Sequence, residues 1–176
     1  SMLETLARNY NYRTKSAKFF ELGRVYIPNE KGQLPDEPRT LMMGMYGDVD
    51  FFDIKGVCEE MFSELHIENV EYERLTDNPV YHPGRSAVIK VNGKTLGVIG
   101  EVHPSVLRNF EIGTKAYIGE LDFMTIFNAS NRDVKYTPLT KFPAVTRDFS
   151  IVVDASTPVA EIEKVMKEAC KYITGI

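Results

Sequence analysis

The spacing of apolar residues indicates where helices lie along the chain. Leu3, Leu6 and Tyr10 recur at helical intervals with polar residues between them, so a helix is expected to open the chain. A longer helix is expected over 50–65, with Asp50 or Asp53 near its amino-terminal cap. Shorter helices are expected over 104–110, with Pro104 in the first turn, and over 122–128. The segments between these helices have the alternating apolar pattern of strands, so the chain is expected to contain both helices and strands.

Alternating apolar runs predict the strands. These runs cover 17–27, 40–46, 70–75, 88–91, 96–99 and 116–121. Asn92-Gly93 separates two of them, and this dipeptide accepts the positive φ angles that a two-residue hairpin turn requires. The pattern therefore predicts a mostly antiparallel α+β domain over 1–130.

The pattern restarts after a polar stretch. Residues 131–140 are expected to be a linker, and 141–176 to begin a second, incomplete unit. In that unit we expect a strand over 147–154, a helix capped by Thr157-Pro158, and a further strand starting near Tyr172.

Composition narrows the possible functions. The net charge of −4 and the pI near 5.5 do not attract nucleic acid to the chain as a whole. No apolar run reaches the roughly 20 residues that a membrane span needs, and no signal peptide pattern opens the chain. We expect a cytoplasmic protein with neither a membrane nor a DNA partner.

The residues that most often bind metals do not form a recognisable motif. Cys58 and Cys170 are far apart and lie in apolar-periodic helical segments, so buried free thiols are expected. The three histidines lack the spacing of a zinc site. No metal site is predicted.

Glu101 and His103 are the candidate catalytic pair. On the end of one strand they would share a face, and a carboxylate next to an imidazole can act as a general base in hydrolysis. The alternative is a structural role, in which they meet at a strand-to-helix junction and His103 bonds to the backbone or to a neighbour. The lack of an evident nucleophile favours the structural role. Arg85 could hold a phosphate, but a salt bridge is the stronger expectation.

One stretch combines basic and aromatic residues. Lys135, Lys141 and Arg147 are interleaved with Tyr136 and Phe142, a composition that suits single-stranded RNA. These three cations are therefore the candidate RNA-binding residues.

Several segments, taken in order, resemble the C-terminal part of the bacterial phenylalanyl-tRNA synthetase β chain. They are Leu3-Glu-Thr-Leu-Ala-Arg-Asn, Phe20-Glu-Leu-Gly-Arg-Val-Tyr, Phe52-Asp-Ile-Lys-Gly, Tyr81-His-Pro-Gly-Arg-Ser-Ala, Gly97-Val-Ile-Gly-Glu-Val-His-Pro and Lys141-Phe-Pro-Ala-Val-Thr-Arg-Asp-Phe-Ser. The resemblance implies a class II synthetase-like antiparallel sheet that is catalytic-like but non-catalytic. It also implies that 141–176 begins a ferredoxin-like anticodon-binding domain.

The same resemblance implies partners. The family assembles as an α2β2 heterotetramer that uses ATP and Mg²⁺ to charge tRNA(Phe) with phenylalanine. Those two cofactors belong to the holoenzyme, and none is expected in this part of the chain. Because the opening helix of such enzymes packs between chains, Leu3, Leu6 and Tyr10 are expected to expose an apolar stripe at a subunit interface.

The chain departs from the family's pattern at three places. The stretch around Gly119 lacks the arginine that grips ATP in the catalytic α chain, which implies a retained fold and a lost site. The family usually has a longer connection after Gly47. Thr146 stands where a second arginine often precedes Asp148, which weakens the RNA assignment there. A stand-alone RNA-binding or regulatory domain, and a hydrolase using Glu101 and His103, remain as alternatives.

Overall fold

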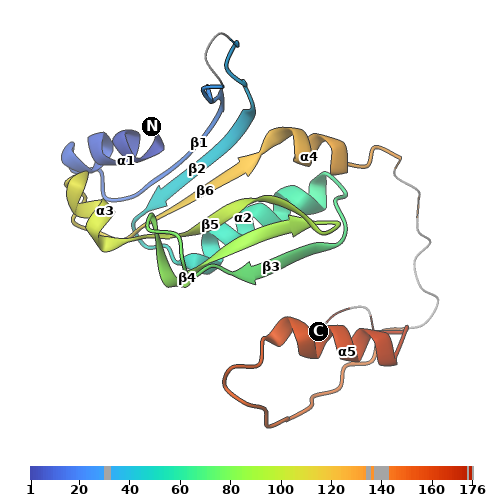
Figure 1. The fold of residues 1–176 in the computed structure, drawn as a ribbon. Coiled ribbons are helices and arrows are strands. Elements are labelled where there is room, and N and C mark those ends of the chain that lie inside the picture. Colours follow the sequence, from blue (N-terminus) through green and yellow to red (C-terminus); the bar gives the residue numbers. More distant parts are fainter. Residues whose placement is uncertain (30–32, 134–135, 137–142, 174, 176) are drawn as a thin grey trace. The chain divides into compact units, whose positions relative to one another are not determined.

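The structure is a computed structural model that describes residues 1–29, 33–133, 136, 143–173 and 175. Its elements are α1 (Met2–Asn11), β1 (Ala17–Arg24), β2 (Arg39–Tyr46), α2 (Phe51–Glu64), β3 (Val70–Arg74), β4 (Tyr81–Val91), β5 (Lys94–Val102), α3 (Pro104–Asn109), β6 (Ala116–Asp122), α4 (Phe123–Ala129) and α5 (Val159–Ala169) (Figure 1). The chain divides into two compact units, Ser1–Lys135 and Tyr136–Ile176. The first contains the strands with α1 to α4, and the second contains α5.

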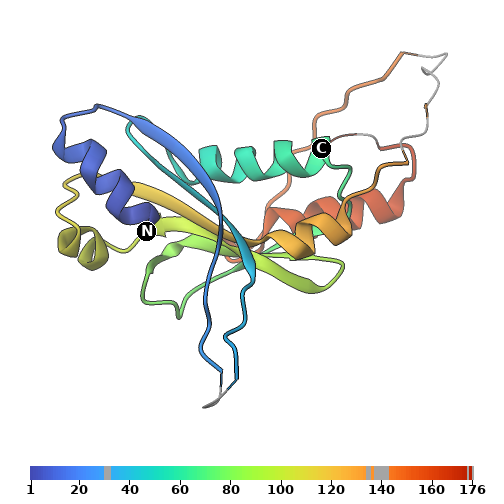
Figure 2. The ribbon, with the colours of Figure 1, turned by 90° about the horizontal axis from the view of Figure 1, so that it is seen from above.

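The first unit is built on a six-stranded sheet with the order β1-β2-β6-β5-β4-β3. Every neighbouring pair is antiparallel. The last strand of this unit among the described residues, β6, lies between β2 and β5 and joins them into one sheet. A bridge between Ile27 and Asp36 continues the β1–β2 pair, which extends away from the other strands (Figures 1 and 2). The structure confirms the predicted antiparallel α+β architecture.

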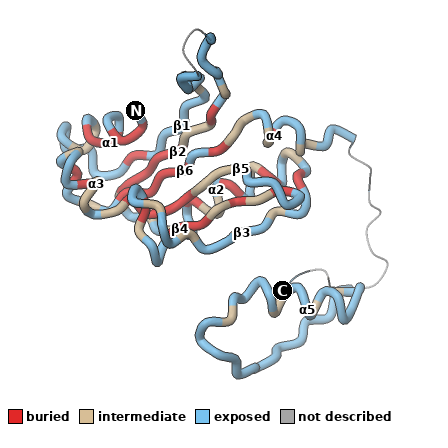
Figure 3. Tube along the Cα trace, viewed as in Figure 1, coloured by how far each residue is buried: buried red, intermediate tan, exposed pale blue. Residues whose placement is uncertain are grey.

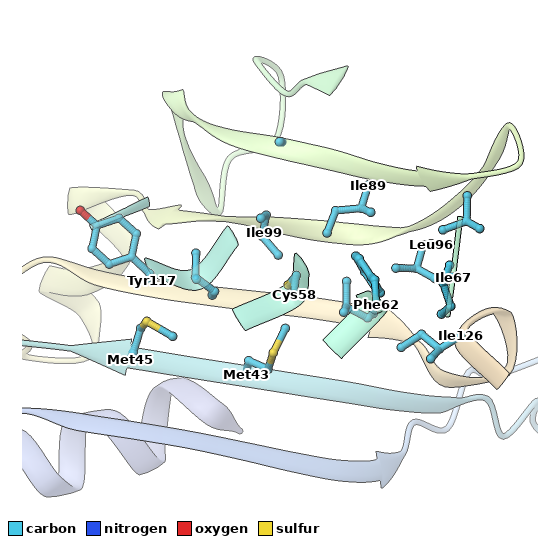
Figure 4. Packing of buried hydrophobic residues seen from close by; sticks show 14 residues of the cluster. Met43, Met45, Cys58, Phe62, Ile67, Ile89, Leu96, Ile99, Tyr117 and Ile126 are labelled. Carbon is cyan, nitrogen blue, oxygen red and sulfur yellow. The ribbon is translucent and has the colours of Figure 1, made fainter. Parts of the chain in front are cut away.

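Apolar side chains pack on both faces of this sheet. One cluster joins Met45 of β2 to Cys58 and Phe62 of α2 and continues over β4, β5 and β6 (Figure 4). The other joins Tyr46 to side chains of α1 and α3. Because successive residues of a strand point to opposite faces, Met45 and Tyr46 enter different clusters. The helices α1 and α2 therefore cover opposite faces of the sheet.

The apolar face of α1 packs against its own sheet. Leu3 and Leu6 are buried, with 9% and 0% of their surface exposed, and Tyr10 is half-buried. A Cβ atom at Gly44 of β2 would lie 2.6 Å from the Cγ atom of Met2, so the missing side chain allows the helix to approach closely. The prediction of an exposed apolar stripe is wrong for Leu3 and Leu6, because both are buried in the cluster that contains Tyr46 of β2, whereas Tyr10 is only half-buried.

Local sequence signals decide the turn between β4 and β5 and the start of α2. Asn92 and Gly93 have φ angles of 51° and 75°, which confirms the predicted hairpin turn. Asp50 is the N-cap of α2 and accepts hydrogen bonds from the backbone N–H groups of Phe52 and Asp53. Both features are formed by residues that are adjacent in the sequence, and neither depends on packing in the core.

The second unit differs from the prediction in its strands. The predicted helix is present as α5, although Pro158 rather than Thr157 is its N-cap. Residues 147–154 do not form a strand, nor do the described residues near Tyr172, which are 171–173 and 175. A strand needs a neighbour for its backbone N–H and C=O groups, and none pairs with 147–154 among the described residues. Most described residues of this unit are exposed, whereas the buried residues lie in the first unit, most of them in the central strands and in α1 and α2 (Figure 3).

The two cysteines have different surroundings. Cys58 is buried in α2, as predicted, whereas Cys170 is exposed after the end of α5. The prediction of a buried Cys170 is wrong because α5 contains no buried residue, so its apolar side has no core to enter. Within the described part of the chain, no helix combines the length and apolar character that crossing a membrane requires.

Replacement of Leu6 tests the packing of α1. Leu6→Ala should lower the free energy of unfolding by about 2–5 kcal/mol, because it leaves a cavity between α1 and the sheet. Leu34→Ala is the matched control, because Leu34 is 88% exposed, and it should change that free energy by less than about 0.5 kcal/mol. Urea denaturation measures both values. A similarly small effect of both substitutions would contradict this packing.

Thiol labelling tests the two cysteine environments. Burial, with a smaller effect from the charge of Glu59, raises the pKa of the Cys58 thiol to about 12. Since the thiolate is the reactive form, an aromatic disulfide reagent should label only Cys170 in the native chain and both thiols after unfolding. The Cys170→Ser variant should stay unlabelled while folded. Rapid labelling of that native variant would show that Cys58 is accessible.

Candidate functional site

The buried carboxylate of Glu101 connects three neighbouring strands, β4, β5 and β6, at one end of the sheet. Glu101 of β5 is 2% exposed. Its two oxygens accept hydrogen bonds from Arg85 of β4, with Nε 2.6 Å from Oε2 and a terminal nitrogen 2.8 Å from Oε1. The hydroxyl of Tyr117 of β6 donates to Oε2 at 3.1 Å. The structure confirms the expected salt bridge of Arg85 and adds Tyr117, which sequence reasoning missed.

The protonation states in this cluster follow from burial and charge. Burial alone would raise the pKa of Glu101, but hydrogen bonds from Arg85 and Tyr117, with the positive charges of Arg85 and Lys115, hold that pKa below its ordinary value. Burial, and next the charge of Glu101, raise the pKa of the Tyr117 hydroxyl to about 12. At neutral pH the carboxylate is therefore charged and the hydroxyl keeps the proton that it donates.

His103 has a separate structural role. It is the N-cap of α3, and its Nδ1 atom accepts from the backbone N–H of Ser105 at 3.2 Å and lies 2.6 Å from the Ser105 hydroxyl. The expectation that His103 bonds to a neighbour at a strand-to-helix junction is confirmed. The expectation that it meets Glu101 is wrong, since no hydrogen bond or ion pair joins the two side chains and Glu101 is occupied by Arg85 and Tyr117. The hydrolytic pair is therefore not assembled.

Two hollows lie on the face of the sheet that α2 covers. One, of about 390 Å³, is apolar and is lined by side chains of β1, β2 and α2, including Phe20, Met43 and Val57. The other, of about 450 Å³, is lined by both charged and aromatic side chains and lies beside the Glu101 cluster, with Arg85 and Tyr117 in its wall. In the described residues, no group of three His, Cys, Asp or Glu side chains could hold a metal ion.

The first unit also matches a known protein family. The family described as the phenylalanyl tRNA synthetase beta chain CLM domain matches residues 1–123, which is most of the chain. The chain belongs to the phenylalanyl-tRNA synthetase beta chain family. This confirms the resemblance that the ordered sequence segments indicated.

Curated members of the phenylalanyl-tRNA synthetase beta chain family extend the match into the second unit. The chain is 46% identical over 168 residues to the phenylalanine–tRNA ligase beta subunit of Clostridium acetobutylicum, covering 95% of this chain and 21% of the relative. It is 44% identical over 168 residues to that of Clostridium tetani, with the same coverage. The chain therefore spans about a fifth of the length of these relatives.

Solved structures of other synthetases share the fold of this beta chain family member. A pyrrolysyl-tRNA synthetase from Desulfitobacterium hafniense has a TM-score of 0.58 at 12% identity, over 72% of this chain and 46% of the other. A second structure of that enzyme gives a TM-score of 0.57 at 14% identity. At such low identity the likeness concerns the fold alone, and it confirms the class II synthetase-like antiparallel sheet.

Of the three predicted RNA-binding residues, Arg147 alone lies in the described part of the chain. Lys135 and Lys141 lie outside the described residues. Arg147 is exposed, and one of its terminal nitrogens donates to the carbonyl of the preceding Thr146 at 2.9 Å. Their role in RNA binding, like the ferredoxin-like nature of 141–176, stays a prediction.

The residues that line the larger of the two hollows are far apart in the sequence. Lys55 and Phe52 belong to α2, whereas Lys115 directly precedes β6, and all three line the hollow. Lys115 and Tyr117 have the two-residue spacing of one strand face, but only the fold brings them beside Arg85. No local motif could have linked these distant segments.

Acid titration of stability tests the Glu101 cluster. Because the folded pKa of Glu101 is depressed, its contribution is complete above the ordinary value of 4.5 and is lost as the pH falls through the lower folded pKa. Glu101→Gln removes this contribution. The gap in unfolding free energy between wild type and Glu101→Gln should therefore narrow from about pH 6 to about pH 3.

Urea unfolding midpoints at each pH measure that gap. Glu68→Gln is the control, because Glu68 is exposed and forms no ion pair with any described residue. The curves of wild type and Glu68→Gln should run in parallel. Parallel curves for Glu101→Gln as well would contradict a paired, charged Glu101.

Proposed function

We propose that this chain is a non-catalytic part of the beta subunit of phenylalanine–tRNA ligase. The match of residues 1–123 to the beta chain family carries this proposal, and the relatives that are 46% and 44% identical support it. In this proposal the sheet unit supports docking of the α chain in an α2β2 assembly. The whole enzyme charges tRNA(Phe) with phenylalanine in the cytoplasm.

The chemistry of the reaction is assigned to the α chain. ATP and Mg²⁺ serve the holoenzyme there, and we assign no residue of this chain to hold them. Glu101 and His103 have structural partners in the sheet unit, which favours the non-catalytic proposal over a hydrolase. No structural observation favours a stand-alone regulatory domain.

The proposed contacts are of two kinds. For tRNA(Phe) we propose Lys135, Lys141 and Arg147, because cations that neutralise phosphates supply much of the affinity for RNA. Leu3 and Leu6 are buried in their own chain, so we do not assign α-chain contacts to them. Docking of the α chain is proposed for the sheet unit as a whole.

Co-purification with an α chain tests this function. The chain, produced together with the phenylalanine–tRNA ligase α chain of a close bacterial relative, should elute with it in size-exclusion chromatography. The chain alone should show no phenylalanine-dependent exchange of pyrophosphate into ATP, because the reaction is assigned to the α chain. An α chain from an unrelated class II enzyme is the matched control. Exchange activity of the isolated chain, or no co-elution with the cognate type of α chain, would contradict the proposal.

A further inference from the structure

The hollow lined by charged and aromatic side chains is a cleft at the beginning of α2. It has a volume of about 450 Å³, which lies within the roughly 300–1,000 Å³ of small-ligand sites. Its walls come from α2, β3, β4 and β6 and from the residues just before β6. The residues that matter for its chemistry are Phe52, Lys55, Arg74, Arg85 and Lys115. All residues of its lining belong to the first unit.

The carboxylates that line the cleft already have partners. Glu73 of the lining accepts a hydrogen bond from Lys90 at 2.6 Å. Glu101 is not part of the lining, and Arg85, which is, pairs with it. Asp50 is engaged in capping α2. Paired carboxylates repel an approaching anion less than free ones do, so the unpaired cations dominate the charge of the cleft.

Two cations of the cleft are available to a ligand. Arg74 and Lys115 are exposed, and neither has a carboxylate partner within 4.0 Å among the described residues. Lys115 is close enough to Glu101 to help lower its pKa, although Arg85 already pairs with that carboxylate. The cleft therefore has positive charge in excess of what its own carboxylates neutralise.

Arg85 presents a preorganised donor edge. Its guanidinium uses Nε and one terminal nitrogen to bind Glu101, and a guanidinium carries five N–H donors. The side chain of Arg85 remains 44% exposed while that of Glu101 is 3% exposed. Because the buried carboxylate fixes the guanidinium, a ligand that binds the remaining donors loses little side-chain entropy.

An aromatic surface lies beside these cations. Phe52, in the first turn of α2, is 72% exposed, although phenylalanine is commonly buried. Phe51 holds it edge-on, with ring centroids 5.7 Å apart. An exposed aromatic ring beside unpaired lysine and arginine side chains is the combination that binds a nucleotide, by stacking on the base and pairing with the phosphate.

We propose that this cleft binds one phosphate-bearing nucleotide. Arg74, Lys115 and the free edge of Arg85 hold the phosphate, and Phe52 stacks on the base. The nucleotide is either one unit of a single-stranded RNA or a free mononucleotide, and both present the same phosphate and base. Only the RNA source rests on the proposed function, since a free nucleotide could bind whether or not the chain serves a tRNA ligase.

Ligand titrations with the 176-residue chain test the cleft. The probes are AMP, inorganic phosphate and a short single-stranded oligoadenylate, each measured by calorimetry at low and moderate salt. Lys115→Glu and Phe52→Ala should each weaken binding of AMP or the oligoadenylate at least about fivefold. Lys115→Arg should keep most of the affinity, because it keeps the charge. Lys94→Glu, which makes the same charge change at the exposed first residue of β5, directly after the hairpin turn, should have little effect.

Each outcome supports or overturns the proposal. Binding of AMP and oligoadenylate, with both cleft variants impaired, supports the proposal with either source, and binding of the oligoadenylate alone supports it with RNA as the source. No saturable binding of either nucleotide probe overturns it. So does loss that is equal in Lys94→Glu, or binding of phosphate and AMP with equal affinity and no effect of Phe52→Ala.

This test is separable from the test of the proposed function. A failure of the cleft leaves co-purification with the α chain unaffected, because that experiment contains neither nucleotide probe nor cleft variant. Arg147→Glu adds a further distinction. It changes the candidate RNA contact of the second unit, so it should leave AMP binding by the cleft unchanged.

Discussion

The buried carboxylate of Glu101 is the constraint on which this end of the sheet depends. A charged group that is removed from water is strongly unfavourable unless it is paired and hydrogen-bonded. Glu101 meets that requirement with donors from two other strands, Arg85 of β4 and Tyr117 of β6. The neighbouring strands must therefore keep their register here, because a shift of one residue would turn Arg85 or Tyr117 to the other face.

The same constraint decides what chemistry the sheet unit can perform. A carboxylate held by a guanidinium and a phenol is charged but is a poor general base, because its lone pairs are occupied and its pKa is lowered. His103 is separated from it by its own role at the start of α3. The fold thus retains the sheet of a synthetase while its most conspicuous ionisable residues hold the structure together. The exposed edge of Arg85 is the part of this cluster that still faces a cleft.

Much of the fold could be predicted from the sequence because its signals are local. Asn92-Gly93 determines a hairpin turn through φ angles that these residues adopt readily. Asp50 caps α2 through hydrogen bonds to residues directly after it. The strand predicted over 147–154 is absent because a strand depends on a distant segment, since it exists only where another backbone pairs with it. An alternating apolar pattern indicates that a segment could form a strand, but it does not show that another strand is there to pair with it.

The sequence by itself determined the kinds of element, their order along most of the first unit, and membership of a synthetase family through its ordered segments. Tertiary structure alone decided which faces are covered. The apolar face of α1, formed by Leu3, Leu6 and Tyr10, would suit another chain equally well. The burial of its leucines and the close approach at Gly44 of β2 show that it packs on the chain's own sheet. Likewise, Arg85, Glu101 and Tyr117 lie on separate strands, and the insertion of β6 beside β5 brings them together. Local geometry is encoded by neighbouring residues, whereas burial and pairing depend on residues that are distant in the sequence and adjacent only in the fold.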